Sequence, residues 1–299
     1  MLLGLAGSVV MFGHGLPERA AVRDSGLTPT VRHEFMGSLW PYTRNPSCLS
    51  DFPYPDAEHL AWWFCMKSDD RPPTLILLGT SHANSHYPGF VGNPGLRHHT
   101  VLSIGTCVFA VMQANFTGDP HNPCYGDRAR KQQEYIDNVI AGNPSIRFAV
   151  IDGLSSHPNA AYIHALDQRI TTLEQRGIRV IVMVPHIRTG FHPKACYPTP
   201  FKPQPRDCRF SPSVREAQVA AFQPAMDELS RTHPELRFFD QNIVFCDSGE
   251  CSYLKDGLPL YRDSYSHLSE YASLQLQTPF TSWAREQVPE LLDAAFVGR

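Results

Sequence analysis

Short apolar runs alternate with longer amphipathic segments along most of the chain, and this alternation restricts the fold more than any other feature. The run Val180–Val184 is apolar throughout, which is typical of a strand covered by helices on both faces. The segment Ala160–Gln175 places apolar residues at three- and four-residue intervals and is followed by Gly177, so it predicts an amphipathic helix. Strands and helices in alternation favour a parallel sheet with right-handed crossovers. The sequence therefore predicts an α/β fold with a central parallel sheet of about five strands.

The order of these segments predicts how the chain is divided. Residues 18–72 show no long hydrophobic period and are rich in Pro, aromatic and polar residues, so we expect a largely irregular linker and lead-in. The domain itself is expected over residues 73–299, which is long enough for one large α/β core. The expected strands are Thr74–Leu78, Thr100–Ile104, Arg147–Ile151, Val180–Val184 and Leu236–Phe239, and the expected helices are Ala83–Phe90, Ala129–Ala141, Ala160–Gln175, Ser213–Thr232 and Ser269–Glu286.

The eight cysteines fall into four couples that are close in sequence. Each couple brackets a loop containing Pro or Gly, which a local bridge would staple, although the sequence alone allows other pairings. Zinc sites need Cys-x-x-Cys or Cys/His couples at ligand spacing, and we find none. Disulfides are therefore the better interpretation, and they imply a secreted or periplasmic compartment. The expected bonds are Cys48–Cys65, Cys107–Cys124, Cys196–Cys208 and Cys246–Cys251.

The N-terminal segment, MLLGLAGSVVMFGHGLP over residues 1–17, carries no Lys, Arg, Asp or Glu. Its length lies at the lower limit for a membrane-spanning helix, and it lacks the positive start of a secretory signal. Three interpretations are open: the end of a transmembrane helix, an atypical signal or anchor, and a buried helix of the domain.

The charge of the chain argues against nucleic-acid binding. Only 18% of the residues are charged and the formal net charge is -3. The basic residues are scattered along the chain rather than clustered, so no electrostatic footprint for a polyanion is visible. We therefore exclude nucleic acid as a partner.

The stretch LILLGTSHANSHYPGF, residues 75–90, brings Ser81 to the end of an expected strand. Leu75–Leu78 predicts a buried strand, and Gly79 after it predicts a turn into a helix. Ligands of parallel α/β sheets bind beyond the carboxyl ends of the strands, so Ser81 is a candidate nucleophile. A serine hydroxyl needs a base to take its proton. We expect the side chain of His82 to point away from Ser81, so the base must come from farther along the chain.

The best candidate base lies in LPLYRDSYSHLSEYAS, residues 258–273, where Asp263 precedes His267 by four positions. Asp263 could orient the imidazole and stabilise its charged form, while His267 carries the proton to and from Ser81. Taken alone, the same stretch could merely cap the last helix through Ser266 or Asp263 and leave His267 at the surface.

Together the two stretches resemble the SGNH hydrolase family. GTSHA is similar to the nucleophile block of that family, and DSYSHLS is similar to its Asp/His block. The similarity is greatest to the extracytoplasmic SGNH domains fused to bacterial multi-pass membrane acyltransferases of the acyltransferase-3 superfamily, which typically show Gly-Asp-Ser-His-Ala and Asp-x-x-His-Leu-Ser. The stretches FCDSGECSYLKDGLPLYRD and VPHIRTGF support it, and the resemblance spans Cys48 to Leu276. It implies an SGNH/flavodoxin-like three-layer fold, a catalytic domain over residues 73–299, and residues 1–17 as the end of a transmembrane helix.

The resemblance also implies an activity. The chain would be a serine-dependent O-acyltransferase with Ser81, His267 and Asp263 as catalytic residues, transferring most often an acetyl group to a hydroxyl of a cell-envelope or secreted polysaccharide. It would lie in the periplasm, tethered at its N-terminus, with a fused or separate membrane acyltransferase domain as partner. No metal or organic cofactor is expected in this domain. The acyl donor, derived for example from acetyl-CoA, would be supplied through the membrane portion.

Two departures from the family pattern bear on this expectation. Thr80 replaces the usual Asp beside the nucleophile, and that Asp is thought to organise the turn. Asp263 lies four residues before His267, whereas the common spacing is three and would select Ser264. Either a one-residue bulge lets Asp263 reach His267, or a Ser-His dyad works with a backbone carbonyl. We favour the bulge.

An acyl-transfer site also needs donors for the oxyanion that forms at the attacked carbonyl. The backbone N–H of Ser81 is one candidate, because it lies at a turn into a helix. The family's second and third blocks transfer weakly to Gly105 and Asn159. Gly105 could instead serve only to turn the chain, and Asn159 could cap the following helix.

Further residues have both a functional and a structural interpretation. Trp62 and Trp63 could stack on sugar rings, but such a cluster more often packs as core beside its disulfide. Arg188 could reach an anionic glycan, although we prefer a solvated loop charge. Asn84 and His86 lie near the nucleophile and could simply begin the first helix.

Two alternatives to the acyltransferase are kept. A carbohydrate acetylesterase would use the same residues with water as the acyl acceptor. A catalytically silent glycan-binding domain is the alternative that the departures at Thr80 and Asp263 motivate.

Overall fold

The computed structural model describes residues 26–297 apart from 37–44, 56, 58–59, 61–62, 108–119, 121, 200–203 and 248. The expected transmembrane or anchor segment, residues 1–17, lies outside this range. No helix within the described residues is long and apolar enough to cross a membrane. In chain order the elements are α3 (Pro29–Met36), α5 (Pro46–Asp51), β1 (Cys65–Lys67), β2 (Leu75–Gly79), α6 (Ser81–Ser85), α7 (Tyr87–Val91), η2 (Pro94–Leu96), β3 (Val101–Ile104), α8 (Arg128–Gly142), β4 (Phe148–Asp152), α9 (Ala160–Glu174), β5 (Arg179–Met183), η3 (Pro193–Cys196), β6 (Arg209–Phe210), α10 (Pro212–Thr232), β7 (Arg237–Phe239), η4 (Gln241–Phe245), β8 (Cys246–Asp247), β9 (Glu250–Ser252), β10 (Leu254–Lys255), β11 (Leu258–Pro259), α11 (Glu270–Gln275), α12 (Gln277–Gln287), η5 (Pro289–Leu292) and α13 (Ala294–Val297).

The core of the fold is a six-stranded sheet in the order β1-β3-β2-β4-β5-β7. The last five strands of this order are parallel, and β1 pairs antiparallel with β3 at the edge. Numbered along the chain, the parallel strands follow the order 2-1-3-4-5, which is that of flavodoxin-like sheets. The direction of strand addition reverses between β2 and β4, so a ligand site is expected beyond the carboxyl ends of these two strands. The α/β fold expected from the sequence is therefore confirmed.

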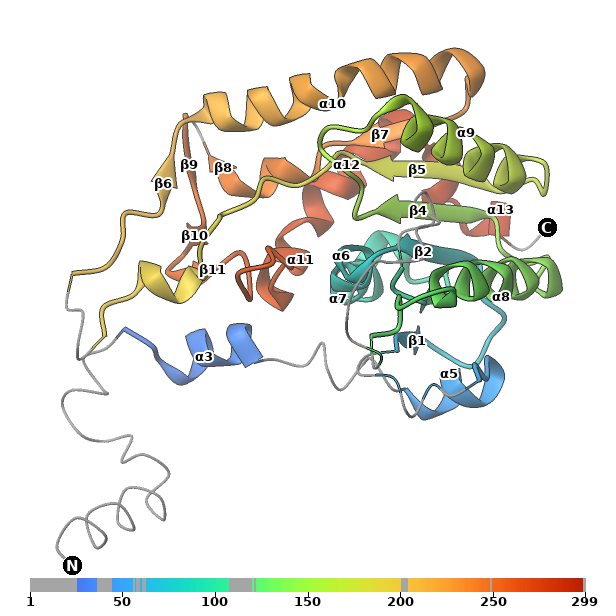
Figure 1. The fold of residues 1–299 in the computed structure, drawn as a ribbon, viewed down its shortest axis with the longest axis horizontal. Coiled ribbons are helices and arrows are strands. Elements are labelled where there is room, and N and C mark those ends of the chain that lie inside the picture. The colour runs from blue at the N-terminus through green and yellow to red at the C-terminus, as the bar shows by residue number, and fades with distance from the viewer. Residues whose placement is uncertain are drawn as a thin grey trace, which may run out of the picture.

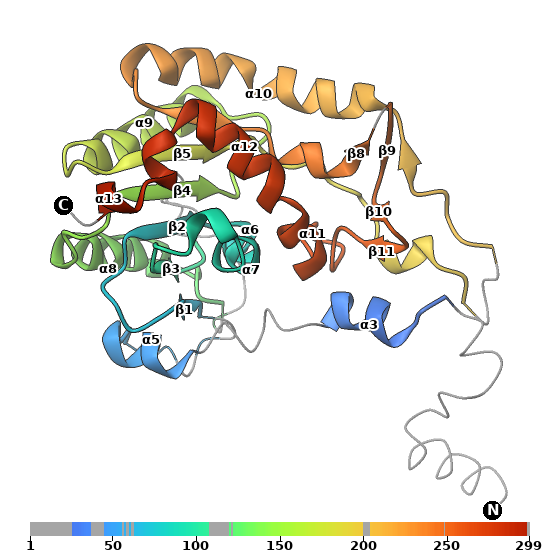
Figure 2. The same cartoon turned by 180° about the vertical axis from the view of Figure 1, so that it is seen from behind.

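Helices cover both faces of the sheet, as the continuous apolar strands predicted. Because side chains alternate along a strand, Leu75 and Leu77 of β2 pack on one side, whereas Ile76 and Leu78 pack on the other. The first face is covered by α7, α11 and α12, and the second by α8, α9 and α10. Figure 1 views the sheet from the side of α8 and α9, and Figure 2 shows α12 in front of the sheet after the half-turn.

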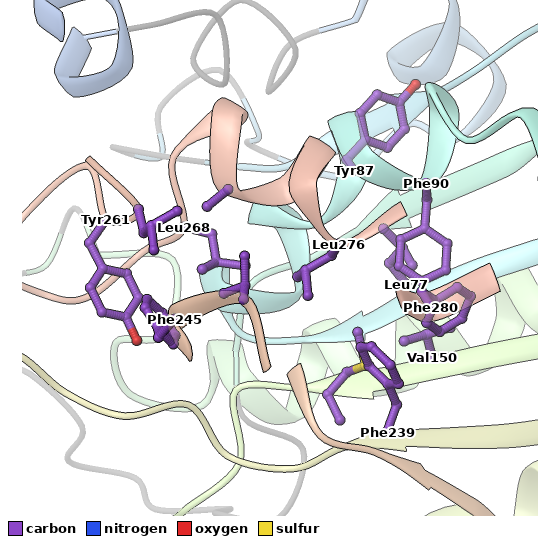
Figure 3. Close-up of a cluster of buried hydrophobic side chains, with 14 of the residues drawn as sticks. Leu77, Tyr87, Phe90, Val150, Phe239, Phe245, Tyr261, Leu268, Leu276 and Phe280 are labelled. Atoms are coloured by element: carbon purple, nitrogen blue, oxygen red, sulfur yellow. The ribbon is translucent and has the colours of Figure 1, made fainter. Parts of the chain in front are cut away.

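Aromatic rings fill the core on the face covered by α7 and α12 (Figure 3). The Phe280 ring lies 4.9 Å from the Phe90 ring and 5.1 Å from the Phe239 ring, measured between centroids. These rings contact Leu77 and Val150, which point out of β2 and β4. This layer joins the C-terminal helices to the first strands of the sheet, so residues far apart in the sequence share one core.

Two expected helices are each divided in the structure. The expected helix Ala83–Phe90 is replaced by α6 and α7, and the expected helix Ser269–Glu286 by α11 and α12. In both cases a proline lies just inside the second helix: Pro88 in α7 and Pro279 in α12. A proline has no N–H to donate to the carbonyl four residues earlier, so a continuous helix is broken there.

Residues 18–72 were expected to be largely irregular, but their described part contains α3, α5 and β1. β1 is only three residues long, and it is placed by pairing with β3 and by the Cys48–Cys65 bond. α3 packs against the C-terminal part of the chain, where the Glu34 carboxylate accepts the N–H of Tyr271 at 2.9 Å. These contacts join residues far apart in the sequence, so no local sequence pattern predicts α3 or β1.

All four expected disulfide bonds are present. Cys246 and Cys251 lie directly opposite each other on β8 and β9. With β6 these strands form a small sheet, and β10 and β11 form another. Both lie beyond the carboxyl ends of the parallel strands (Figure 1). The bonds Cys196–Cys208 and Cys246–Cys251 therefore staple short strands that the sequence analysis did not anticipate.

A close backbone contact joins the two central strands at the switch point. Gly79 ends β2 with a φ of +132°, and a Cβ on it would lie 1.9 Å from the carbonyl oxygen of Asp152 at the end of β4. No other residue type fits this place without moving a strand.

We expect Gly79→Ala to lower the free energy of unfolding by about 3 kcal/mol or more, because it combines backbone strain with a clash against main chain. Gly142→Ala is the matched control, since a Cβ on Gly142 at the end of α8 meets nothing within 4 Å. It should leave the stability unchanged or raise it by up to about 1 kcal/mol. Urea unfolding of the two variants measures the difference, and equal midpoints would contradict the contact.

Candidate active site

The structure brings Ser81, His267 and Asp263 into one hydrogen-bonded chain. Ser81 Oγ lies 2.6 Å from His267 Nε2, and His267 Nδ1 lies 2.7 Å from Asp263 Oδ2. Burial acts to raise the pKa of Asp263, but its hydrogen bonds from His267 and the charge of that ring outweigh burial, so the pKa lies below its ordinary value. An ionised carboxylate only accepts, so Nδ1 carries the proton and Nε2 is left to accept from the serine hydroxyl.

The three members of this chain come from two parts of the fold. Ser81 is the first residue of α6, immediately beyond the carboxyl end of β2. Asp263 and His267 belong to a turn that precedes α11, and this turn is closed by a hydrogen bond from the N–H of Arg262 to the carbonyl of His267 at 2.9 Å. The two segments are 186 residues apart in sequence at the Ser81–His267 contact. The packing of α11 against α7, which follows α6, and of α12 against the sheet helps to bring them together.

The four-residue spacing between Asp263 and His267 is accommodated by a bulge, as we favoured. Ser266 has a φ of +67°, a left-handed conformation that absorbs the extra residue. Asp263 Oδ1 also accepts the backbone N–H groups of Tyr265 at 3.0 Å and of His267 at 3.2 Å. One carboxylate therefore shapes the turn and orients the imidazole, and no backbone carbonyl has to replace it.

Thr80 caps the N-terminus of α6, the helix that begins with Ser81. Its hydroxyl accepts the N–H of His82 at 3.3 Å. A Cβ on Gly153 would lie 1.9 Å from Thr80 Oγ1, so the threonine side chain packs directly on the backbone after β4. Threonine and aspartate are both good N-caps, which explains how the turn keeps its shape without the usual Asp.

The two weakly transferred oxyanion residues are engaged elsewhere. The N–H of Gly105 donates to the carbonyl of Phe64 at 2.9 Å, and the φ of +79° shows that the glycine turns the chain. Asn159 is exposed and caps α9, with its carboxamide oxygen accepting the N–H of Tyr162 at 2.9 Å. The structural alternative holds for both residues. The backbone N–H of Ser81 is left as a candidate donor, because the first N–H groups of a helix have no carbonyl partner within it.

The ring of His82 lies beside that of the candidate base, His267, and makes no hydrogen bond to Ser81 among the described residues. Its ring centroid is 4.5 Å from that of His267 and 4.2 Å from that of His186. Both ring nitrogens of His82, and Nε2 of His186, are buried without a hydrogen-bond partner among the described residues. Burial lowers the pKa of His82 well below its ordinary value, with the charges of His186 and His267 adding to the effect. His82 therefore packs against His267 as a neutral ring, which the run Ser81-His82 in the sequence did not reveal.

A second buried polar cluster holds the switch point together. His86 Nε2 lies 3.0 Å from Asp152 Oδ2 and 2.9 Å from Gln241 Oε1, and the Gln241 amide donates to Asp152 Oδ1 at 2.8 Å. Burial acts to raise the pKa of Asp152, but the hydrogen bond and charge of His86 outweigh it, so this pKa is also lowered. Asn84 donates to Ser103 Oγ at 2.8 Å on β3. Asn84 and His86 thus fix α6 to the sheet rather than merely beginning a helix.

The tryptophan cluster has a structural role where the structure describes it. Trp63 is 1% exposed, and its ring stacks on Tyr54 with centroids 4.0 Å apart. It packs in the same core as the Cys48–Cys65 bond, so it is closed to a sugar. Trp62 lies outside the described residues.

Comparison with known proteins identifies the family of the chain. A family model described as "SGNH domain (fused to AT3 domains)" matches residues 47–282. The chain belongs to this family. The solved periplasmic domain of a lipopolysaccharide acetyltransferase from Salmonella ser. Paratyphi A is 12% identical, with a TM-score of 0.52 over 73% of this chain and 85% of that chain. At this identity the likeness shows a shared fold. No curated protein matches the chain.

The described part of the SGNH domain contains no group of three or more His, Cys, Asp or Glu side chains that could hold a metal ion. All eight cysteines are in disulfides, so none is a thiol nucleophile. The chemistry that the geometry allows is nucleophilic attack by Ser81 with His267 as base and Asp263 as the group that orients it.

Asp263→Asn should lower the rate of covalent labelling of Ser81 by at least about a hundredfold, because an amide neither stabilises the charged imidazole nor selects its tautomer. The amide oxygen can still accept from Tyr265 and His267, so the turn should persist. The rate constant for labelling by a fluorophosphonate measures the effect. Asp127→Asn, at the exposed start of α8, is the control and should label at the wild-type rate.

The buried histidines predict acid sensitivity of the fold. Burial lowers the pKa of His186 to about 3, whereas an unfolded histidine titrates near 6.5. Between these values the unfolded chain holds a proton that the folded chain lacks, so the free energy of unfolding falls as the pH falls, by about 1.4 kcal/mol per pH unit for one histidine.

His186→Phe should reduce the slope of the unfolding free energy against pH, between pH 6 and pH 4, by about 1.4 kcal/mol per pH unit, which corresponds to one proton. Urea unfolding at several pH values measures this slope. An unaltered slope in His186→Phe would mean that this ring is protonated in the folded domain.

Proposed function

We propose that the chain is a serine-dependent O-acyltransferase that transfers an acyl group, most often acetyl, to a hydroxyl of a cell-envelope or secreted polysaccharide. The observation that carries the proposal is the hydrogen-bonded chain Ser81–His267–Asp263, with contacts of 2.6 and 2.7 Å, at the switch point of a flavodoxin-like sheet. Membership of a family of SGNH domains fused to AT3 domains supports acyl transfer over other serine chemistry.

The proposed reaction has two balanced steps. In the first, Ser81 Oγ attacks the carbonyl of the donor while His267 Nε2 takes the hydroxyl proton, and the proton then goes to the leaving group as its bond to the acyl carbon breaks. In the second, an acceptor hydroxyl gives its proton to His267 and attacks acyl-Ser81. Ser81 leaves with that proton, and the ester is transferred. Asp263 remains ionised throughout and stabilises the imidazolium in both steps.

The proposed setting is the periplasm, next to a fused or separate membrane acyltransferase domain. Four disulfide bonds support an oxidising compartment. The similar solved structure is the periplasmic domain of a lipopolysaccharide acetyltransferase, which supports the same setting and a saccharide acceptor. The acyl donor would come through the membrane portion, and the SGNH domain itself would need no cofactor.

The alternative of a catalytically silent domain is less well supported by the geometry. It was motivated by Thr80 and by the Asp263–His267 spacing, yet Thr80 caps α6 and Asp263 reaches the imidazole. An esterase would share every step except the last, in which water replaces the sugar hydroxyl. It is distinguished by the acyl acceptor alone.

Intact-mass analysis after treatment with a fluorophosphonate tests the nucleophile. The wild-type chain should gain one adduct, and Ser81→Ala and His267→Ala should each remove it, because one lacks the oxygen and the other the base. His157→Ala is the matched control and should label like the wild type. Circular dichroism establishes that each variant is folded.

An unlabelled wild-type chain with an intact fold would overturn the proposal and favour the silent domain. A labelled wild-type chain that releases acetate to water, and never to a saccharide in the presence of its membrane partner, would favour the esterase.

A further inference from the structure

The loop after β5 and the turn that holds His267 lie side by side at the edge of the site. The N–H of Thr189 donates to Ser266 Oγ at 3.3 Å. The hydroxyl of Tyr261 donates to the carbonyl of Ile187, which anchors the same loop a second time. Asn242 Oδ1 accepts the N–H of Ile187 at 2.8 Å. The two segments therefore form one fixed unit, with the residues next to Thr189 and Ser266 at its surface.

Tyr265 is the aromatic residue that this unit presents to solvent. It is 73% exposed, although it lies between the two members of the Asp263–His267 pair. Its ring centroid is 6.3 Å from that of His267. The N–H of Tyr265 is held by Asp263 Oδ1, the carboxylate that also orients the imidazole. The backbone of Tyr265 is thus held by the same turn that orients the imidazole.

Arg188 is the exposed arginine of this unit. It is exposed and precedes Thr189, the residue bonded to Ser266. Among the described residues, no hydrogen bond or ion pair joins its guanidinium to a partner. Burial is the main cause that lowers the pKa of His186, and the charge of Arg188 is the next, so the guanidinium acts on the ring that packs against His82. The exposure of Arg188 confirms the solvated loop charge that the sequence analysis favoured, and the loop lies beside the turn that holds His267.

We propose that Tyr265 and Arg188 form the acceptor subsite, in which a sugar ring stacks on Tyr265 while an anionic group of the same saccharide pairs with Arg188. The proposal deepens the proposed function and rests on it for the role of the bound saccharide. An aromatic face suits the apolar face of a pyranose, and it loses little side-chain entropy on binding. A guanidinium presents a planar fork of donors that fits a carboxylate or a phosphate. The subsite therefore selects anionic over neutral saccharides.

Position supports this assignment for Tyr265 over other exposed tyrosines. Tyr125 is also exposed, at 39%, but it lies before α8 and its ring faces the guanidinium of Arg128. The ring of Tyr265 instead lies 6.3 Å from that of the candidate base, measured between centroids, and its backbone N–H donates to the orienting carboxylate. A sugar stacked on it would lie next to Ser81 Oγ, where an acceptor hydroxyl has to be during transfer.

The test is an array of neutral and anionic bacterial saccharides, probed with the whole chain carrying Ser81→Ala so that binding is measured without turnover. We expect binding to anionic saccharides in preference to neutral ones. Tyr265→Ala should raise the apparent Kd for the best ligand about tenfold, whereas Tyr265→Phe should keep the affinity. Arg188→Gln should remove the preference for anionic saccharides, and Arg188→Lys should restore part of it.

Tyr125→Ala and Arg176→Gln are the matched controls, because both residues are exposed and lie on other parts of the domain. Both should bind like the parent. A lack of preference for anionic saccharides, or equal effects of the Tyr265 and Tyr125 variants, would overturn the subsite. Fluorophosphonate labelling of Ser81 in the wild-type chain is scored separately. If Ser81 is not labelled but anionic saccharides still bind, the proposed acyltransferase activity is contradicted and a saccharide-binding site remains. If Ser81 is labelled but anionic saccharides do not bind, only the proposed subsite is contradicted.

Discussion

The close approach of Gly79 to the carbonyl of Asp152 is the contact on which the site depends. β2 and β4 are the central strands of the sheet, and the sheet grows outward from them in both directions. Because no Cβ stands between the two strands, α6 can begin directly beyond β2 with Ser81 as its first residue. The buried cluster of His86, Asp152 and Gln241 ties the same point to η4. The candidate nucleophile Ser81 is thus carried by a tightly constrained part of the fold.

The base is held by a less regular part of the chain, and a different kind of contact makes it precise. Asp263 closes its own turn through two backbone N–H groups and accepts from the imidazole with its other oxygen. Ser266 adopts a left-handed conformation and bonds to the loop after β5. This short polar turn can position the imidazole because its backbone N–H groups are bonded to Asp263, the residue that also orients the imidazole. The same pairing fixes Tyr265 at the surface beside the site.

Sequence-based prediction succeeded where the signal is local. The apolar runs located the parallel strands, and the short spacings between cysteines predicted the four bonds, because each loop is closed by residues near in sequence. It failed at β1 and at α3, and it did not foresee that the ring of His82 packs against that of His267. β1 is placed by its pairing with β3, and α3 by its contact with the C-terminal helices. The two packed histidine rings come from residues that lie far apart in the sequence. The divided helices show a further limit of the hydrophobic period as a guide. The period runs on across Pro88 and Pro279, whereas each proline interrupts the helical hydrogen bonds.

The sequence by itself determined the α/β class, which depends on periodicity, and its resemblance to the SGNH family pointed to Ser81, His267 and Asp263 as candidate catalytic residues. Only the tertiary structure decided that the longer Asp263–His267 spacing is workable, that Thr80 replaces an aspartate as a cap, and that Gly105 and Asn159 are engaged elsewhere. It also decided that His82 and Arg188 belong to the surroundings of the site. The reason is physical: a motif names side chains, whereas a hydrogen bond of 2.6 Å between residues 186 apart depends on every contact that folds the chain between them.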